Sequence, residues 1–345
     1  IAIGVPVFPP YVEIPRLPRY GLEVVELKAS AVDQQGRHTW QFPPEELAKL
    51  SDPSIKALFL VNPSNPPSVA VQPQSIRQLI SMVKKDNPDL MIITDDVYAT
   101  FVDNYRSLMA DLPFNTIGVY SFSKYFGVTG WRLGVIAIHE HNVFDKLLRQ
   151  LPTDKRQLLK QRYESLTEDP EGLLFIDRMV ADSRQVALNH TAGLSTPQQV
   201  QMAIFCIFAL LDRDDRYKQL TKDICHRRIR LLYEGLRLDQ PCLPYDADYY
   251  TQFDLEEWSQ QQYGPEFTDY LKRHYDPLDI LFRLAQNSSI VLLGGGGFHG
   301  PTWSIRVSLA NLDDQDYAKI GQELRKVLDE YVSEWQTSRK PLYHN

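Results

Sequence analysis

The 345-residue chain is predicted to be an α/β protein, with a large domain on a mixed, mostly parallel sheet and a smaller C-terminal α+β domain. Three features predict this fold class. Short apolar runs recur through the first 140 residues, a helical pattern separates two of them, and strands with alternating polarity follow among helices after residue 240. The length allows two cores, because domains commonly have about 100–200 residues.

Five apolar runs in the first part have the length of buried strands: residues 24–27, 57–61, 90–94, 117–120 and 133–138. Residues 74–85, between the second and third runs, carry apolar side chains at helical spacing. This alternation predicts parallel strands with both faces covered. The opening residues 1–6 also read as a strand inside a domain. Because the first residue is Ile1 and not methionine, we expect the N-terminal part of the large domain to be missing.

Residues 142–184 are charged and helical in pattern, and we expect a helical insertion there. A solvated hairpin is the first interpretation, and an oligomer contact or an active-site cover remains open. Residues 198–211 are predicted to form a buried helix, and 217–236 a long amphipathic helix that bridges two domains.

The second part of the chain predicts a strand at 248–255, a helix at 264–274 and a strand pair at 290–293 and 304–309. The predicted boundary therefore gives a large domain over residues 1–215 and a small domain over residues 216–345.

Composition excludes several classes of protein. The formal net charge of −7 gives no support for nucleic-acid binding. Three widely spaced cysteines fit neither a disulfide framework nor a zinc site, which favours a cytoplasmic protein. The longest strongly apolar run is roughly half a membrane span, and no signal peptide is visible, so we expect no membrane contact.

Lys124 is the most informative residue, because it follows the apolar run 117–120 and is flanked by Ser121 and Ser123. A lysine there can form a Schiff base, and the two hydroxyls can donate to phosphate oxygens. Arg132, eight positions later, offers a planar fork that suits a phosphate. These are the chemical requirements of pyridoxal 5′-phosphate (PLP). The alternative is an ordinary surface turn that leads into a strand.

Asp95 ends the apolar run 90–94, and Tyr98 follows three residues later. A carboxylate at a strand end can pair with the pyridine nitrogen of PLP and keep it protonated, and the phenol can reach the ring oxygen. The alternative is a helix N-cap, for which Asp is common. Asp96 is the neighbouring candidate, and we choose Asp95 because its spacing to Tyr98 suits both roles.

Three further residues complete the predicted site. Asn65, in a proline-rich turn, can hold its amide against the ring oxygen or the substrate, and Phe8 can stack on a planar ring. Arg306 alternates with apolar residues in a strand and can bind a substrate carboxylate. A plain connection, a core aromatic and an internal ion pair are the respective alternatives.

Two patterns carry no chemistry in this interpretation. Residues 295–300 match the dinucleotide glycine spacing but lead into a strand, so we expect a flexible loop over a site. Residues 139–141 contain two histidines and a glutamate without a third ligand type nearby, and we expect no metal.

In their order along the chain, these site residues resemble those of the fold-type I PLP-dependent aminotransferases: Phe8, Asn65, Asp95, Tyr98, Ser121, Lys124, Arg132 and Arg306. The resemblance covers nearly the whole chain. It implies the three-layer PLP-dependent transferase-like fold, with cofactor contacts at the first seven positions and a contact to the substrate α-carboxylate at Arg306. It also implies that Lys124 is the general base at the substrate Cα.

Residues 175–184, 187–194 and 297–304, with the helical insertion, resemble the aspartate 4-decarboxylase subgroup, the bifunctional aspartate aminotransferases and L-aspartate β-decarboxylases. This implies β-decarboxylation of L-aspartate to L-alanine and CO2, with aspartate:2-oxoglutarate transamination as a second activity. It also implies a homodimer that builds a dodecamer.

One departure from the family pattern has no explanation in the sequence: Pro67 and Ser68 stand where many aminotransferases have Thr-Gly. It weakens assignment to an ordinary aminotransferase acting on another amino acid, which remains the alternative function. A third possibility is a non-catalytic module with this fold, which the set of Lys124, Asp95, Tyr98 and Arg306 argues against.

Overall fold

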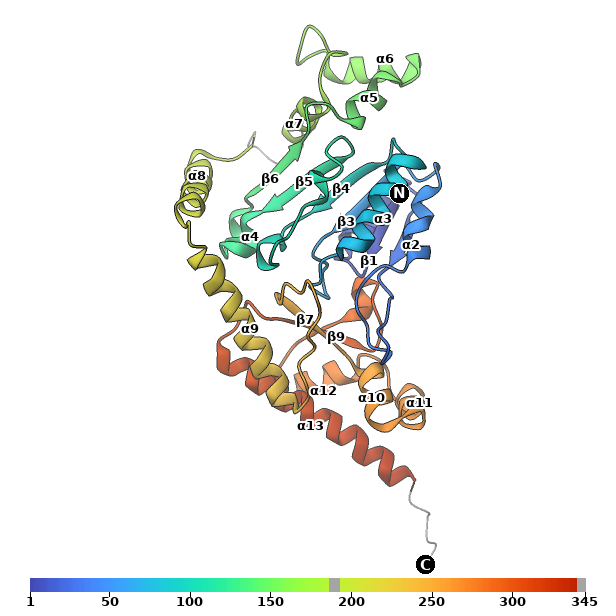
Figure 1. Ribbon diagram of the computed structural model, residues 1–345, viewed down its shortest axis with the longest axis vertical. Coiled ribbons are helices and arrows are strands. Elements are labelled where there is room, and N and C mark those ends of the chain that lie inside the picture. The colour runs from blue at the N-terminus through green and yellow to red at the C-terminus, as the bar shows by residue number, and fades with distance from the viewer. Residues whose placement is uncertain (186–192, 340–345) are drawn as a thin grey trace, which may run out of the picture.

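A computed structural model describes residues 1–185 and 193–339 of the chain. The molecule is elongated, with a helical insertion at one end, a six-stranded sheet in the middle and a second, smaller sheet among helices at the other end (Figure 1). Among the described residues, no helix has both the length and the apolar character needed to cross a bilayer.

The large sheet has the strand order β2-β1-β3-β4-β5-β6. Its strands are β1 (Ala2–Val5), β2 (Val25–Lys28), β3 (Ala57–Val61), β4 (Met91–Asp95), β5 (Thr116–Ser121) and β6 (Gly134–Ile138). The first five strands are parallel, which confirms the predicted mixed, mostly parallel sheet.

The expectation for the last of these strands was wrong, because β6 runs antiparallel to β5 and is not buried. Val135 and Ile136 are exposed on this strand, which lies at the edge of the sheet. An apolar run in the sequence predicts that a strand forms, but the direction of that strand in the sheet depends on how the preceding chain connects to it.

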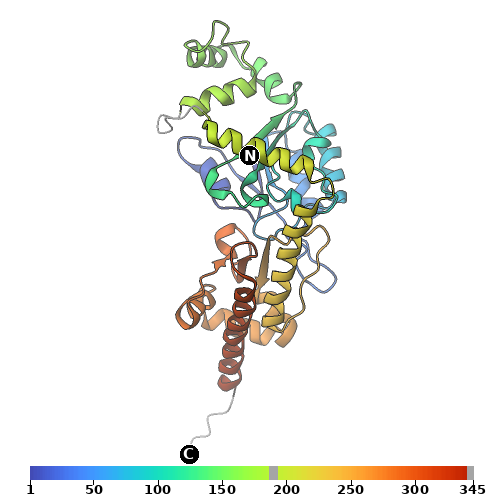
Figure 2. The same ribbon diagram turned by 90° about the vertical axis from the view of Figure 1, so that its left-hand side faces the viewer.

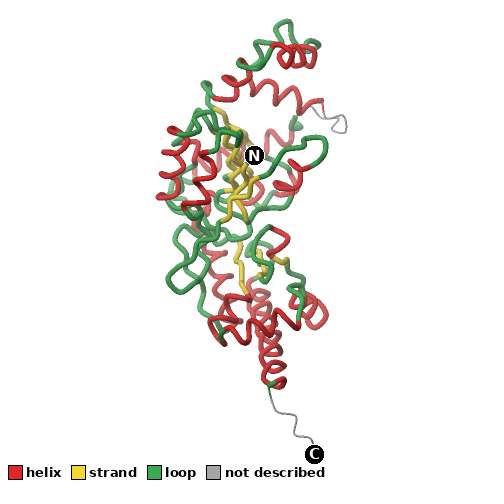
Figure 3. The backbone as a smooth tube through the Cα atoms, turned by 90° about the vertical axis from the view of Figure 1, so that its right-hand side faces the viewer, coloured by secondary structure: helices red, strands yellow, loops and turns green. Residues whose placement is uncertain are grey.

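Successive side chains of a strand point to opposite faces of the sheet, so the continuous apolar runs make both faces of the large sheet apolar. Leu58 and Leu60 of β3 pack with Leu79 of helix α3 (Pro73–Lys85). Val61 packs on the opposite face, in a cluster that includes Cys225. Figure 3 shows the strands nearly edge-on with helices beside them. Helices α1 (Pro10–Arg16) and α2 (Pro44–Ala48) lie in the connections after β1 and β2.

The predicted insertion contains three helices: α5 (Val143–Arg149), α6 (Thr153–Tyr163) and α7 (Phe175–Gln185). Its helices extend away from the sheet (Figure 1). The carboxylate of Asp145 in α5 accepts from the backbone N–H of Phe175 at 2.7 Å, which fixes the start of α7 against α5. Arg178 is buried and donates to the carbonyl oxygen of Pro170 at 3.0 Å.

Helix α8 (Thr196–Leu211) forms where a helix was predicted, but none of its residues is buried, so the prediction of burial was wrong. A capping box between Ser195 and Gln198 starts the helix. Ile204 and Leu210 are among its exposed apolar side chains. Composition gives the helix, whereas burial depends on a facing surface that the described residues do not supply.

The second part of the chain has an antiparallel sheet in the order β7-β9-β8, formed by β7 (Tyr250–Asp254), β8 (Leu293–Gly294) and β9 (Ser304–Ser308). The strand expected at 290–293 is thus only the two-residue β8, which begins three residues later and ends one residue later than expected. The helices are α9 (Arg216–Leu236), α10 (Leu255–Tyr263), α11 (Pro265–His274), α12 (Asp279–Ser288) and α13 (Asp314–Ser338). The sequence interpretation missed α10, α12 and α13.

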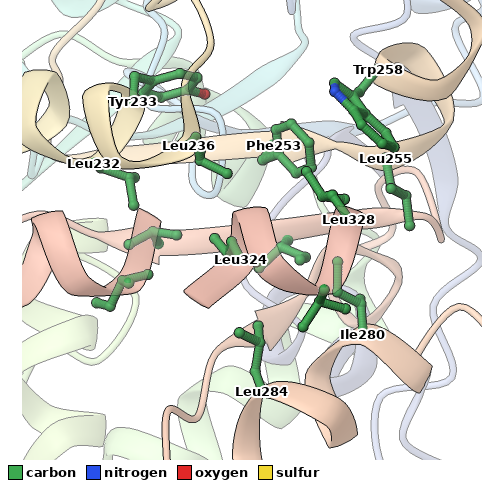
Figure 4. Close-up of a cluster of buried hydrophobic side chains, with 14 of the residues drawn as sticks. Leu232, Tyr233, Leu236, Phe253, Leu255, Trp258, Ile280, Leu284, Leu324 and Leu328 are labelled. Carbon is green, nitrogen blue, oxygen red and sulfur yellow. The ribbon is translucent and has the colours of Figure 1, made fainter. Parts of the chain in front are cut away.

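Helix α9 contributes to two apolar clusters. Cys225 packs with residues of the large sheet, whereas Ile229 and the residues after it pack in the second core (Figure 4). Figure 4 shows Leu232 and Leu236 of α9 facing Leu324 of α13. The division at residues 215 and 216 stays a prediction, and α9 begins at Arg216.

Helices α9 and α13 lie side by side (Figures 1 and 2) and approach closely at two glycines. A Cβ added to Gly321 would lie 2.1 Å from the carbonyl oxygen of Leu232 and 3.0 Å from the Cα of Gly235. Backbone atoms cannot move aside as a flexible side chain can, so only glycine fits.

We therefore expect Gly321→Ala to lower the free energy of unfolding by about 1–3 kcal/mol or more, the usual cost of overpacking. Thermal denaturation followed by circular dichroism measures this. Gly297→Ala is the matched control, because a Cβ there meets nothing within 4 Å. Equal melting temperatures for both variants would contradict this packing.

Candidate active site

Three of the predicted residues lie at one edge of the large sheet, where parallel strands end. Asp95 is the last residue of β4, Ser121 is the last of β5, and Asn65 lies in the loop after β3. The β3–β4 register pairs Val61 with Asp95, so these strands end together. Ligands of open α/β sheets bind at this edge.

Asp95 is largely buried, and burial raises the pKa of its carboxyl group above the usual range. The hydroxyl of Tyr11 donates to its Oδ2 at 2.8 Å, and the backbone N–H of Val97 donates to Oδ1 at 3.1 Å. Both hydrogen bonds, and the charge of Lys124, oppose the rise in pKa. A buried carboxyl group of this kind gains from a cationic partner, and a protonated pyridine nitrogen is such a partner.

Asp96 has a different environment from Asp95. Its Oδ1 accepts from the hydroxyls of Thr94 at 2.7 Å and Tyr105 at 2.9 Å. Tyr105 also donates to the carbonyl oxygen of Asn62 at 2.9 Å. These contacts tie the end of β4 to neighbouring loops, so Asp96 has the environment of a structural residue, and the choice of Asp95 stays a prediction.

Lys124 lies on the short helix α4 (Phe122–Tyr125), which Ser121 caps by accepting from the backbone N–H of Ser123 at 3.1 Å. The Nζ of Lys124 is 5.8 Å from the centroid of the Tyr249 ring. Within residues 1–185 and 193–339, this amine has no hydrogen-bond partner, so it is available for reaction.

The structure brings together only some of the residues that were expected to bind the phosphate. The hydroxyl of Ser121 donates to that of Ser123 at 2.8 Å, so the two serines lie together. Arg132 has a left-handed backbone conformation, and its Nη1 donates to the carbonyl oxygen of Thr129 at 2.9 Å instead of meeting the serines. Its guanidinium is exposed and remains able to bind an anion.

Arg306 and Asn65 meet across 241 positions of sequence: Nη1 of Arg306 donates to Oδ1 of Asn65 at 2.9 Å. The guanidinium lies between two aromatic rings, 4.5 Å from the centroid of Tyr250 and 4.6 Å from that of Phe298. Its Nε is buried without a hydrogen-bond partner in the described chain. The group therefore has donor capacity that a carboxylate could use.

Tyr98 is buried, and its hydroxyl donates to that of Tyr250 at 3.1 Å. Burial, followed by the neighbouring Tyr250, raises the pKa of the Tyr98 phenol well above its usual value, so it stays protonated as a donor. Phe8, by contrast, is 47% exposed beyond the end of β1, which leaves its ring free to stack on a ligand.

Sequence reasoning missed Tyr11, Tyr249 and Tyr250. The position of Tyr11, three residues after Phe8 in the segment that follows the first strand, was a usable signal, as was the tyrosine pair near the start of a predicted strand. The segment at 295–300 forms a short 3₁₀ helix (Gly295–Phe298) whose Phe298 carbonyl accepts from the backbone N–H of Val7 at 2.9 Å. It thus contacts the site from the second part of the chain.

Together these groups fit PLP in kind. A free lysine amine, a buried carboxyl group at the sheet edge, a phenol donor, paired serine hydroxyls and an exposed aromatic ring are the donors and surfaces that the cofactor uses. The fold and this set define a PLP-dependent transferase class. The chain belongs to the aminotransferase class I and II family, whose sequence model matches residues 1–324.

The more specific likeness is to a bifunctional aspartate aminotransferase and L-aspartate β-decarboxylase of Pseudomonas sp., 49% identical over 340 residues. The match covers 99% of this chain but 63% of that relative's length. An aspartate aminotransferase of Sulfolobus acidocaldarius is 37% identical over only 103 residues, or 29% of this chain.

Solved structures agree on the fold. Aspartate aminotransferase of Thermus thermophilus, as a double mutant, superposes with a TM-score of 0.65 at 19% identity, covering 94% of this chain and 69% of that one. Cystalysin of Treponema denticola superposes with a TM-score of 0.61 at 16% identity, covering 97% of this chain and 70% of that one.

Proposed function

We propose that this chain is the core of a PLP-dependent enzyme that converts L-aspartate to L-alanine and CO2, with aspartate:2-oxoglutarate transamination as its second activity. The observation that carries the proposal is that Lys124, whose amine has no hydrogen-bond partner in the described chain, lies just after β5, while the largely buried carboxyl group of Asp95 ends the neighbouring strand β4. The likeness to the Pseudomonas enzyme along 99% of the chain supports aspartate as the substrate.

Seven residues would hold the cofactor: Lys124, Asp95, Tyr98, Asn65, Ser121, Ser123 and Arg132. Phe8 would stack on its ring. PLP, when bound, supplies an electron sink for a carbanion on the substrate. Lys124 accepts the proton from the substrate Cα and returns it, as a general base and acid. Asp95 keeps the ring nitrogen protonated, and Tyr98 donates to the ring oxygen.

Arg306 binds and orients the substrate α-carboxylate as a charge-assisted pair. In the decarboxylation, the bond between Cβ and the β-carboxyl carbon breaks, CO2 leaves, and Cβ takes a proton to give alanine. In the transamination, the amino group of L-aspartate is transferred by way of the cofactor to 2-oxoglutarate, so oxaloacetate and glutamate are released. Excluding water from the site favours decarboxylation, because the half-reaction that releases oxaloacetate consumes a water molecule.

The direct test is to incubate the full chain with PLP and L-aspartate and to measure alanine and CO2. Both products in equal amounts support the proposal. Oxaloacetate with glutamate from added 2-oxoglutarate, but no CO2, would instead support an ordinary aminotransferase. A protein that stays colourless with PLP and makes neither product would be a non-catalytic module.

We expect Arg306→Ala to weaken the apparent affinity for L-aspartate by about 2–5 kcal/mol, or roughly 30- to 5,000-fold in KM, because a buried charge-assisted pair is lost. Steady-state kinetics measures this change. Arg230→Ala is the matched control, because Arg230 is exposed on α9. A KM for Arg306→Ala equal to that of the control would rule out this carboxylate contact.

We also propose that the protein is cytoplasmic and assembles as a homodimer that builds a dodecamer. The resemblance of the helical insertion to that of the decarboxylase subgroup supports the larger assembly. Sedimentation velocity of the full chain measures the assembly size, and a species no larger than a dimer at micromolar concentration would exclude the dodecamer.

A further inference from the structure

Ser68 holds an unusual position in the loop that also carries Asn65. It is fully buried, and its backbone has φ of 70°, in the left-handed region that favours glycine. Its backbone N–H donates to the carbonyl oxygen of Ser64 at 3.0 Å, which closes the loop. A serine in this conformation is strained, so its side chain must provide a contact that glycine cannot.

The side chain of Ser68 contacts the start of strand β7. Its Oγ accepts from the backbone N–H groups of Tyr249 at 3.0 Å and Tyr250 at 3.3 Å. Its carbonyl oxygen accepts from the backbone N–H of Ala247 at 2.8 Å. Because β7 is an edge strand of the small sheet, Ser68 supplies acceptors for amides that the sheet leaves unpaired.

Tyr250 contacts both Ser68 and Arg306, the proposed carboxylate-binding arginine. In the antiparallel register, Tyr250 pairs with Ser308, and Gln252 pairs with Arg306, so Tyr250 and Arg306 are diagonal neighbours on one face. The Tyr250 ring lies 4.5 Å from the guanidinium, and its hydroxyl accepts from Tyr98. Tyr250 therefore contacts both the substrate arginine and the phenol proposed for the cofactor.

Three contacts and one stretch of the loop form a closed circuit. Asn65 accepts from Arg306, Arg306 stacks on Tyr250, the Tyr250 amide donates to Ser68, and Ser68 lies three residues from Asn65 in the same loop. A guanidinium held from two sides in this way loses little rotational freedom when it binds a carboxylate, which is preorganisation. Glycine at position 68 would keep the loop but would open the circuit.

We propose that Ser68 and Tyr250 are positioning residues that set Arg306 against Asn65 for recognition of a substrate carboxylate. The serine departs from the glycine that many aminotransferases have at this position, and the structure gives the departure a role: its hydroxyl joins the proline-rich loop to β7. The inference rests on the proposed function, because it takes Arg306 as the carboxylate-binding group.

The test measures binding of succinate, an unreactive dicarboxylate, to the PLP-loaded full chain by calorimetry, together with kcat and KM for L-aspartate. The variants are Ser68→Gly, which suits the left-handed backbone, Tyr250→Leu, and the double variant. Ser64→Gly is the matched control, because in the described part of the chain the Ser64 hydroxyl bonds only to the backbone of Val69, within the loop. Thermal melts confirm that each variant is folded.

We expect Ser68→Gly and Tyr250→Leu each to raise the Kd for succinate by about tenfold, within the range for residues that act through one network. KM for L-aspartate should rise by a larger factor than kcat falls. The Kd of the double variant for succinate should lie within about twofold of that of the single variant that binds succinate more weakly. Ser64→Gly should bind succinate within about twofold of the unmodified chain.

Wild-type affinity in both Ser68→Gly and Tyr250→Leu would overturn the inference, as would fully multiplicative effects in the double variant. If Ser68→Gly does not fold, Tyr250→Leu and its kcat-to-KM split decide alone. An unmodified chain that neither binds succinate nor turns over L-aspartate would overturn the proposed function together with this inference.

Discussion

Replacing Lys124 by alanine is expected to abolish turnover of L-aspartate while leaving the fold intact. Loss of a general base alone lowers rates by about 10²–10⁴-fold, and the loss of the amine that bonds the cofactor adds to this. The fold should survive because no described residue depends on the Lys124 amine for a hydrogen bond. The cation–π contact to Tyr249, at 5.8 Å, is long.

Two measurements check this expectation. Product formation from L-aspartate gives the rate, and a visible absorbance spectrum after addition of PLP and gel filtration reports whether the cofactor remains bound through the lysine. Lys326→Ala is the control, since this lysine is exposed on α13 and, among residues 1–185 and 193–339, pairs only with Glu323. If Lys124→Ala kept both the spectrum and the rate of the control, another lysine would hold the cofactor.

Replacing Asp95 by asparagine has the second largest expected effect, a fall in turnover of about 10²–10⁴-fold, because a neutral amide cannot keep the ring nitrogen protonated. Asparagine retains one oxygen that can accept from Tyr11, but its amide nitrogen cannot accept from the backbone N–H of Val97, so one of the two hydrogen bonds is lost. Turnover of L-aspartate at saturating PLP is the measurement, and a decrease of less than about tenfold would be incompatible with this role.

The same substitution should change the stability of the cofactor-free chain in a pH-dependent way. Burial raises the pKa of Asp95 in the folded chain, so the folded state holds more protons than the unfolded state. Stability of the unmodified chain therefore falls as the pH rises from the unfolded to the folded pKa of Asp95. Asparagine has no charge to bury. The melting temperature of Asp95→Asn relative to that of the unmodified chain should therefore be higher at pH 7 than at acidic pH.

Asp96→Ala is the matched control for this experiment, and its effects should be reversed. It leaves the buried hydroxyl of Thr94 without its acceptor, which costs about 1–3 kcal/mol, whereas Tyr105 keeps the carbonyl oxygen of Asn62 as an acceptor. We expect a clear loss of melting temperature. Turnover measured well below the melting temperature should change far less than in Asp95→Asn. A large loss of turnover in Asp96→Ala with little change in Asp95→Asn would instead make Asp96 the cofactor-binding acid and Asp95 the structural one.

Much of the large domain could be predicted from the sequence because its strands are short apolar runs that end in polar residues. Strand β3 was predicted at its observed bounds, and β4 and β5 within one residue at each end. The direction of β6 and the exposure of α8 could not be predicted, since both depend on surfaces far away in the sequence. Helix α13 was missed although its apolar residues recur at helical spacing.

The candidate site divides in the same way. Asp95, Ser121 and Lys124 could be found because each follows directly from a strand end, where the chemistry is local in sequence. Tyr250 could not be found, because its importance lies in contacts to Ser68, 182 positions away, and to Arg306. The direction of the Arg132 side chain could not be predicted either. It follows from a left-handed backbone conformation that the sequence motif does not indicate.

Helix α9 has a consequence for how the two cores unfold. It has 21 residues, or about 31 Å of helix, and Cys225 and Ile229 lie in different cores one turn apart. One helix thus packs in both cores, and we expect the two cores to unfold together as one cooperative unit. A destabilising substitution in either core should then lower the stability of the segments that carry both Arg306 and Lys124.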